Sequence, residues 1–420
     1  MKGTEMDARH QLSQLLATRE QLYSLPQAFY GDEAFHQLDI ALIWNRSWIF
    51  AAPECVIPAT GNWFTLDVGT SSIVIVRGAA GEVRALYNTC RHRGSKLCVG
   101  QQGKVARLVC PYHQWTYGLD GQLLFARDMG PTFDAKQFPL KQAHCRVVGG
   151  LVYICLADQA PDIEPFAQTV EPYMQPHGLK NAKVAFTQTL IERANWKLVL
   201  ENNRECYHCS ANHPELLRTL SEYDDVNDPR MAPAFAARIK AKGAQWDTQG
   251  LPHVSQMSPD KRFRVVRLPL ASGTSMTMDG ALAVKGGLLG GLQDADLGSV
   301  RLLSLPNNWN HLQADHALAF RVLPIGPQET MVTTWWLVNQ DAREGIDYDV
   351  DNLKRVWFAT NDQDRMLAEN NQAGINSKAY EPGPYSPTIE FGVQNFIDWY
   401  TSEMSAGLGE SRPAITLRVA

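Results

Sequence analysis

The sequence predicts an α+β protein in which a small antiparallel β domain precedes a larger domain of mixed strands and helices. The first observation is a series of short runs rich in Val, Ile, Phe, Tyr and Thr, separated by glycine-containing turns, between residues 47 and 155. The second is a change of pattern from residue 162 onward, where strand-like and helical patterns alternate. We therefore expect an N-terminal helical segment (1–46), a β domain (47–160) and a mixed domain (161–420).

Each element follows from its own pattern. Apolar residues at Leu12, Leu15 and Leu16 indicate that residues 1–45 are helical. In the β domain, alternating β-branched and aromatic residues predict strands at 62–67, 72–77, 83–87 and 151–156. In the mixed domain we expect strands at 187–195, 302–305, 317–323 and 330–338, and helices at 196–217, 349–371 and 391–404. Residues 225–298 are the least regular and form either a lid or pocket wall, or a surface insertion.

The composition excludes several classes of function. The chain has 420 residues, of which 45% are hydrophobic and 20% charged, and its formal net charge is −5. This mild acidity argues against a nucleic-acid or anionic-membrane partner. The polar N-terminus lacks the apolar core of a signal peptide, and no apolar run reaches the roughly 18 residues of a membrane span. We expect a cytoplasmic protein whose 8 cysteines do not form a disulfide framework.

Two cysteine–histidine pairs lie in the predicted β domain. One residue separates Cys90 from His92, and two residues separate Cys110 from His113. Such loops at the tips of neighbouring hairpins bring two thiolates and two imidazoles together. This set suits one tetrahedral zinc, or a Rieske [2Fe–2S] cluster, in which thiolates hold one iron and imidazoles the other. The single residue between Cys90 and His92 aims their side chains at adjacent but different metals, so the spacing favours the cluster.

A second pair of histidines, His208 and His213, lies near the end of a predicted helix. Five positions on an ideal helix correspond to about 140° of net rotation, so we expect the helix to loosen and bring both imidazoles to one side. Two histidines and one carboxylate form the facial triad that binds Fe(II) and leaves positions open for O2. Periodicity leaves open whether Asp362 or Asp364 supplies the carboxylate, because only one of them can face the core.

Glu205 precedes His208 by three positions and therefore shares its face of the predicted helix. This carboxylate is expected to hydrogen-bond a metal-binding histidine, or to relay protons and electrons to it. The alternative is a surface glutamate without such a role.

Together, these motifs resemble the α subunits of Rieske non-haem iron oxygenases over residues 25–400. The segments ENNRECYHC, CRHRGSKLC, CPYHQWTYGLDG and PNNWNHLQADHALAF resemble the branch that acts on quaternary ammonium compounds, which includes glycine betaine monooxygenases and proline betaine demethylases. Ring-hydroxylating members usually carry Asp where this chain has Glu205. The resemblance implies a Rieske domain followed by a helix-grip catalytic domain, built on an antiparallel sheet.

The resemblance also implies a role for each candidate residue. The cluster ligands would be Cys90, His92, Cys110 and His113, and the ligands of the mononuclear Fe(II) would be His208, His213 and Asp364. The pair Gln363-Asp364 ahead of Glu369 matches the family's carboxylate segment and so selects Asp364. Glu205 matches a carboxylate that bridges a cluster histidine of one subunit and an iron histidine of the next. A ring of subunits, commonly a homotrimer, is therefore implied.

The implied reaction is oxidative N-demethylation of a glycine betaine-like compound with O2, releasing formaldehyde. Electrons would come from NAD(P)H through a separate reductase with a flavin and its own iron–sulfur centre, since the sequence shows no nucleotide-binding fingerprint. One alternative is a Rieske oxygenase that hydroxylates or dealkylates another substrate, such as an aromatic acid. A Rieske protein that only transfers electrons, or a structural zinc module, are alternatives from other classes. The long chain after the cluster and its second histidine pair argue against the electron-transfer protein, and a brown colour of the purified protein would exclude the zinc module.

A quaternary ammonium group cannot donate hydrogen bonds and binds instead against aromatic faces. Trp309, in the turn-rich segment PNNWNH, is the first candidate for such a face. His311 and His316 are candidates for contact with a betaine carboxylate, with a structural role as the alternative for each.

Overall fold

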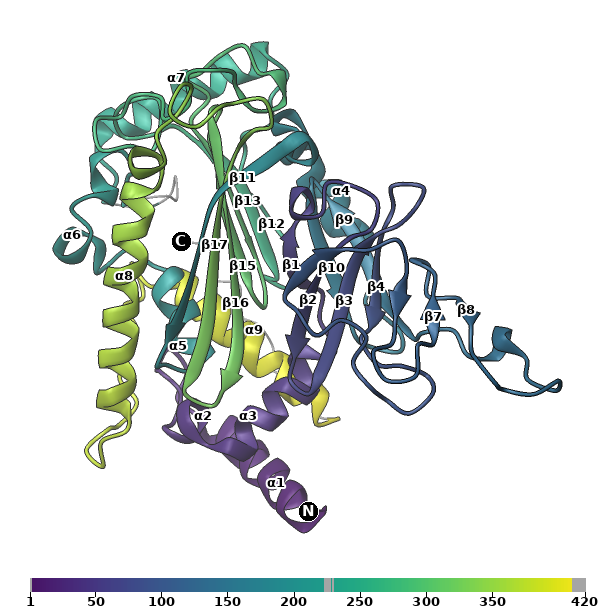
Figure 1. The fold of residues 1–420 in the computed structure, drawn as a ribbon. Coiled ribbons are helices and arrows are strands. Elements are labelled where there is room, and N and C mark those ends of the chain that lie inside the picture. Colours follow the sequence, from purple (N-terminus) through teal and green to yellow (C-terminus); the bar gives the residue numbers. More distant parts are fainter. Residues whose placement is uncertain (1, 223–227, 229, 410–420) are drawn as a thin grey trace.

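In the computed structural model, which describes residues 2–222, 228 and 230–409, the strands form two large antiparallel sheets and one small one (Figure 1). The first sheet has, in spatial order, β1 (Ile49–Pro53), β10 (Leu151–Cys155), β9 (Gln142–Val148), β4 (Val83–Tyr87), β3 (Ser71–Arg77), β2 (Asn62–Val68) and β5 (Gln102–Lys104). The second has β11 (Ala182–Glu192), β17 (Glu329–Asn339), β16 (His316–Gly326), β15 (Asn308–Leu312), β14 (Ser299–Ser304), β13 (Phe263–Leu268) and β12 (Gln256–Met257). The small sheet has β6 (Leu108–Val109), β7 (Thr116–Tyr117) and β8 (Leu123–Phe125).

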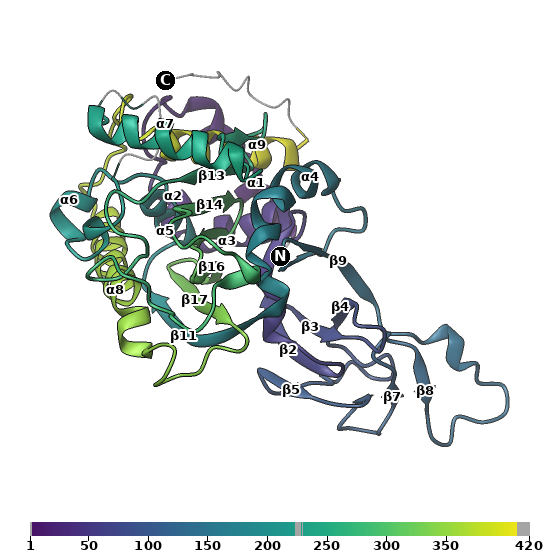
Figure 2. The same cartoon turned by 90° about the horizontal axis from the view of Figure 1, so that it is seen from above.

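Helices pack mainly around the second sheet. They are α1 (Lys2–Thr18), α2 (Ala28–Gly31), α3 (Glu33–Asp39), α4 (Glu164–Met174), α5 (Trp196–Asn203), α6 (Cys209–Asn212), α7 (Pro233–Thr248), α8 (Val350–Ile375) and α9 (Phe391–Gly407). The long helix α8 lies along one side of the second sheet, and the first and small sheets lie on the other side of the molecule (Figures 1 and 2). No helix in the described ranges is long and apolar enough to cross a membrane. The predicted α+β class is confirmed.

The sequence of β3, SSIVIVR, explains how the first sheet is held. Successive side chains of a strand point to opposite faces. Ile73 and Ile75 lie in the main hydrophobic core, whereas Val74 and Val76 lie in a second core beneath the small sheet. Because both faces are covered, β3 is an almost continuous apolar run.

Several helices begin where a polar side chain caps the first turn. The Asp32 carboxylate accepts hydrogen bonds from two backbone amides of α3, the Asn195 side chain accepts one from Lys197 N at 3.0 Å, and Asp349 accepts one from Asn352 N at 2.8 Å. The last two caps fix the starts of α5 and α8, the helices that flank the site described below.

A buried carboxylate joins the N-terminal segment to the rest of the chain. Asp39, at the end of α3, accepts hydrogen bonds from Trp196 Nε1 at 2.9 Å, Lys197 Nζ at 2.5 Å and Tyr400 OH at 2.7 Å. Both the Asp39 and Lys197 side chains are fully buried. A buried ion pair is tolerated only when its remaining hydrogen-bonding capacity is satisfied, so this network ties α3, α5 and α9 together.

The expected helix over 196–217 is wrong. Helix α5 ends at Asn203, a loop follows, and only the short α6 continues the pattern. The polar side chains of this loop hydrogen-bond to other groups instead of extending a helix, as described below. The irregular region 225–298 contains α7 and the strands β12 and β13. Residues 223–227 and 229 lie outside the described part.

Candidate active site

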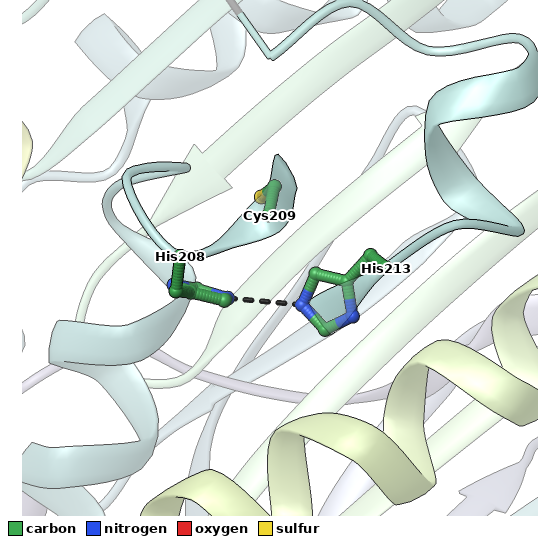
Figure 3. Close-up of side chains that lie close together, drawn as sticks. All are labelled: His208, Cys209 and His213. Carbon is green, nitrogen blue, oxygen red and sulfur yellow. Dashed lines mark hydrogen bonds between the residues drawn. The ribbon is translucent and has the colours of Figure 1, made fainter. Parts of the chain in front are cut away.

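The two histidines His208 and His213 lie at either end of the short helix α6 and turn toward each other (Figure 3). Their Nε2 atoms are 2.9 Å apart, and the rings stand at 80°. The tight backbone turn does this, since His213 N donates to Cys209 O at 2.8 Å. Glu205 and His208 therefore meet through a loop. The sequence had predicted a shared helix face for them, and that prediction is wrong.

Helix α8 supplies a carboxylate to the same place. Asp364 Oδ1 lies 3.0 Å from His213 Nε2 and 3.4 Å from His208 Nε2, and it accepts a hydrogen bond from Asn202 Nδ2 at 2.9 Å. Asp362 points elsewhere and pairs with Arg365 at 2.7 Å. Three ligand atoms thus converge as a facial triad requires, with Asp364 in the position that periodicity left open.

The electrostatics of this group suit a cation. Burial lowers the pKa of the His208 imidazole, but hydrogen bonds with Asp364 and Glu205 outweigh burial and raise this pKa to about 9. Burial raises the pKa of Asp364, but the two imidazoles hold it below its ordinary value. Carboxylates that favour a proton on these imidazoles also favour a metal ion between them. Two imidazoles and one carboxylate are a donor set that fits Fe(II).

Each imidazole is held at its other ring nitrogen. His208 Nδ1 lies 2.6 Å from Glu205 Oε1, and His213 Nδ1 lies 2.8 Å from Gln363 Oε1. The Gln363 amide in turn donates to Glu215 Oε2 at 2.9 Å. Such partners fix the tautomer and orientation of a metal-binding histidine. Sequence reasoning identified Glu205 but missed Gln363 as the partner of His213, because Gln363 lies 150 positions away in the sequence. It also gave no role to Glu215, which holds the Gln363 amide.

The two cysteine–histidine loops, one after β4 of the first sheet and one between β6 and β7 of the small sheet, have the same backbone turn. Gly94 N donates to Cys90 O, and Gln114 N donates to Cys110 O, each at 3.0 Å. The last residue of each turn has a positive φ, 79° at Gly94 and 59° at Gln114. A glycine adopts this conformation without cost, and a few other residues tolerate it. The sequence anticipated the two loops, and the structure shows them as a matched pair.

The side chains of these loops fit a Rieske cluster. The His92 and His113 rings lie 4.7 Å apart, and His92 stacks on Trp115 at 4.9 Å. Cys90 is buried, and its Sγ lies 3.4 Å from the Tyr117 hydroxyl, which also accepts a hydrogen bond from Arg91 N. The cysteine sulfur is held by a hydrogen-bond donor, and the two imidazoles lie side by side nearer to solvent. A Rieske [2Fe–2S] centre requires this arrangement.

A cavity of about 440 Å³ reaches the histidine–aspartate group. We call it the main cavity. Its wall includes His208, His213 and Asp364, and, from the second sheet and α8, Arg301, Trp309, His311 and Trp357. Met257 and residues 261–264 of the irregular region also line it, so part of 225–298 is a pocket wall.

Of the three residues proposed for substrate contact, two lie in the wall of the main cavity and the third, His316, does not. Trp309 and His311 project from β15 into the main cavity, where Trp309 stacks on Phe320 at 4.9 Å. The expectation that Trp309 lies in a turn is wrong, because it is a buried strand residue. His316 is fully buried and lies 3.0 Å from Asp315, which is a structural pairing.

A second cavity, of about 340 Å³, lies on the other side of Glu205. We call it the side cavity. Its wall includes Glu205, His208 and Glu201, whose carboxylate accepts hydrogen bonds from Tyr30 OH at 2.9 Å and Tyr385 OH at 3.0 Å. Burial raises the pKa of Glu201 to about 7, although both tyrosines and Lys197 act to lower it.

Glu201 should make stability depend on pH. Its pKa is about 7 in the folded protein and its ordinary value is 4.5, so between these values the folded state binds more protons than the unfolded state. Stability is therefore lost as pH rises from about 4.5 to about 7. In Glu201→Gln this contribution is absent. We expect the difference in unfolding midpoint, wild type minus variant, to fall across this range, as measured by thermal unfolding. A difference that stays constant with pH would contradict the assignment.

Comparison with known proteins gives the class. Residues 47–139 match the Rieske [2Fe-2S] domain, and residues 179–406 match the ring hydroxylating alpha subunit (catalytic domain). The chain therefore belongs to the α-subunit family of Rieske non-haem iron oxygenases, which confirms the predicted family, enzyme class and cofactor set.

Three individual proteins illustrate how similar this chain is to known sequences and folds. The chain is 53% identical to the glycine betaine monooxygenase oxygenase subunit of Pseudomonas aeruginosa over 405 residues, covering 96% of this chain and 94% of that protein. It is 50% identical to the subunit of that name from Chromohalobacter salexigens over 410 residues, covering 97% and 92%. Its fold is similar to a crystal structure of a quaternary ammonium Rieske monooxygenase in complex with γ-butyrobetaine, with a TM-score of 0.67, 21% identity, and coverage of 92% and 98%.

Proposed function

We propose that this chain is the terminal oxygenase of a two-component monooxygenase that N-demethylates glycine betaine or a close analogue. The observation that carries the proposal is the main cavity. One wall holds the His208–His213–Asp364 group, and the wall from the sheet and α8 offers aromatic rings and the buried Arg301. The identity of 50–53% to glycine betaine monooxygenase oxygenase subunits supports this substrate class.

The site residues have the following proposed roles. A Rieske cluster is held by Cys90, His92, Cys110 and His113, and a mononuclear iron by His208, His213 and Asp364. The proposed Rieske domain spans residues 47–160 and the catalytic domain residues 161–420, with 1–46 as a helical segment before them.

The proposed reaction is balanced as follows. The substrate R–N⁺(CH3)3, O2, two electrons and two protons give R–N⁺(CH3)2–CH2OH and water. The hydroxymethyl group then loses formaldehyde, and its C–N electron pair returns to nitrogen, which leaves a tertiary amine and a proton. When bound, the iron supplies oxygen activation and C–H hydroxylation. Asp364, His208 and His213 would hold the iron at the wall of the main cavity.

Residues of the cavity wall suit both ends of a betaine. Trp309 and Trp357 offer ring faces to a quaternary ammonium. Arg301, on β14, is 6% exposed and is the register partner of His311 on β15, so both side chains lie on the same face of the sheet. A guanidinium in a buried wall pairs with a carboxylate through two parallel hydrogen bonds. We assign the substrate carboxylate to Arg301, with His311 beside it.

Electron transfer is proposed to cross between subunits of a homotrimer. The cluster tip, residues 90–94 and 109–127, and helix α6 lie on opposite sides of the molecule in both views (Figures 1 and 2). Exposed apolar side chains and arginines cover the tip: Val109, Tyr112, Leu124, Phe125, Arg91, Arg93 and Arg127. The side cavity carries the carboxylates Glu201, Glu205 and Glu390. Complementary charge of this kind supports docking of one chain's tip beside the Glu205 of the next.

A formaldehyde assay tests the proposal. Purified, iron-loaded protein is combined with a surrogate reductase and NADH, and offered glycine betaine, proline betaine, choline, carnitine and benzoate-type acids in turn. We expect formaldehyde from glycine betaine or a close analogue. If an aromatic acid gave an oxygen-dependent product without formaldehyde, the assignment of two iron centres would stand. The assignment of a quaternary ammonium substrate would be refuted.

Replacement of Arg301 by Gln should weaken binding of the carboxylate end of the substrate. A hydrogen bond to a charged group contributes about 1.5–3 kcal/mol, so KM for glycine betaine should rise about 10- to 100-fold. Choline, which carries the same ammonium but no carboxylate, is the matched ligand, and its inhibition constant should change little. Arg301→Lys keeps the charge and should recover part of the loss. An equal change for both ligands would show that Arg301 shapes the cavity without reading the carboxylate.

A further inference from the structure

One disulfide, between Cys206 and Cys209, lies inside the site. Both cysteines line the main cavity, and the pair brackets Tyr207 and His208. Cys209 Sγ and the nearest ring nitrogens of His208 and His213 all lie within 4.8 Å of one another. The cysteines were not expected to form a disulfide framework, and the sequence alone indicated no role for this pair.

The turn that carries the pair brings its sulfur atoms together. The Cα atoms are 4.9 Å apart, within the range that a disulfide requires. Cys209 N also donates a hydrogen bond to Cys206 O at 3.3 Å, so the backbone closes the same turn without help from the sulfurs. The two thiols therefore stay adjacent after reduction, and the bond can form again without rearrangement of the chain.

The remaining cysteines differ in their surroundings. Cys90 and Cys110 lie in the cluster loops. Burial raises the pKa of the thiols of Cys55 and Cys98, to about 12 and about 11. A thiol reacts through its thiolate, so such groups are inert near neutral pH. Of the 8 cysteines, Cys206 and Cys209 are the two in the walls of the cavities described here.

We propose that Cys206 and Cys209 are a redox-active dithiol–disulfide pair that consumes hydrogen peroxide in the main cavity. An oxygen-activating site produces peroxide whenever two electrons and two protons reach O2 without hydroxylation of the substrate. This source of peroxide rests on the proposed function, whereas the reactivity of the pair does not. A small diffusible oxidant released in the main cavity meets these sulfur atoms, which line the cavity, before it can reach thiols outside the cavity walls.

The chemistry is that of a two-cysteine peroxide trap. The Cys209 sulfur attacks one oxygen of H2O2, so that an S–O bond forms, the O–O bond breaks and one water leaves. The Cys206 sulfur then attacks the Cys209 sulfur, the S–S bond forms, the S–O bond breaks and a second water leaves. The dithiol is oxidised by two electrons and the peroxide is reduced to two waters. An external thiol reductant, by thiol–disulfide exchange, restores the dithiol.

Mass spectrometry of the intact holoprotein tests the pair without reliance on turnover. The protein is reduced with dithiothreitol, freed of it, exposed to added H2O2 and alkylated. We expect alkylation of Cys206 and Cys209 after reduction, and its loss at both after peroxide, so that the peroxide-treated protein carries two alkyl groups fewer. Cys98 is the matched control and should keep its alkylation state throughout. A pair that stays oxidised under reductant, or stays reduced under peroxide, overturns the proposal.

Single variants identify the attacking sulfur. In Cys206→Ser the second step cannot occur, so a sulfenic acid should accumulate at Cys209 and be trapped by dimedone. The reverse variant, Cys209→Ser, should give little dimedone adduct at Cys206. Adduct at neither residue in either variant refutes the two-step reaction. Added peroxide separates this outcome from failure of the proposed function, because the formaldehyde assay is not involved.

Discussion

Replacement of Glu205 by Gln should lower turnover about 100-fold or more while both metal centres remain occupied. The carboxylate holds His208 Nδ1 at 2.6 Å and lies where the main and side cavities meet. A neutral amide keeps the size of the side chain but loses the charge that attracts a proton during electron transfer. The formaldehyde assay measures the loss, and iron and acid-labile sulfide content measure the metals.

Rapid-mixing spectroscopy locates the defect. A pre-reduced cluster should be reoxidised quickly by O2 in wild type with substrate, and should stay reduced in Glu205→Gln. Glu344→Gln, which alters an exposed carboxylate in the loop after β17, is the matched control and should behave as wild type. Loss of iron from Glu205→Gln would instead make Glu205 structural, and normal reoxidation would place the electron path elsewhere.

Replacement of Asp364 by Ala should remove one metal and leave the other. The variant loses one of the three proposed iron ligands and leaves His208 and His213 without the carboxylate beside them. We expect iron content to fall from about three to about two atoms per chain, with sulfide unchanged at about two. The visible spectrum of the cluster should persist, and formaldehyde production should stop.

Asp362→Ala provides the matched comparison on the same helix. Asp362 is half exposed and pairs with Arg365, and an exposed ion pair contributes little to stability. This variant should keep about three irons and its activity. If it were the one to lose iron, the ligand would be Asp362 and the arrangement of α8 seen here would be wrong.

The sequence predicted what depends on neighbours along the chain. The loops at Cys90 and Cys110 could be recognised because all ligands of each loop lie within four residues. The choice between Asp362 and Asp364 could not be made from periodicity, because it depends on Asn202 and on two imidazoles from another segment. The resemblance to a family supplied that choice, and the distances at Asp364 agree with it.

Two wrong predictions, a turn at Trp309 and a helix over 196–217, have physical causes as well. The segment around Trp309 looked like a turn because Asn308 and Asn310 are polar. In the folded chain, Asn308 donates to Phe320 O at 2.9 Å and Asn310 donates to Asn308 at 2.6 Å. Buried polar groups are stable when they are paired in this way, so a strand can carry them. The helix predicted over 196–217 failed for a related reason, since the Glu205 carboxylate, in the loop after α5, accepts a hydrogen bond from Tyr207 N and contacts His208.

The Asp39 network limits how the protein can be divided by genetic means. Lys197 belongs to the catalytic half, but the carboxylate that pairs with it comes from Asp39, which precedes the first strand β1. A gene fragment starting at residue 161 would encode His208 and His213, and it would also encode a buried ammonium group without the Asp39 carboxylate that accepts its hydrogen bond. An uncompensated buried charge costs several kcal/mol, roughly 3–5 in mutated ion pairs. The two halves carry separate motifs, but we therefore expect them to fold as one unit.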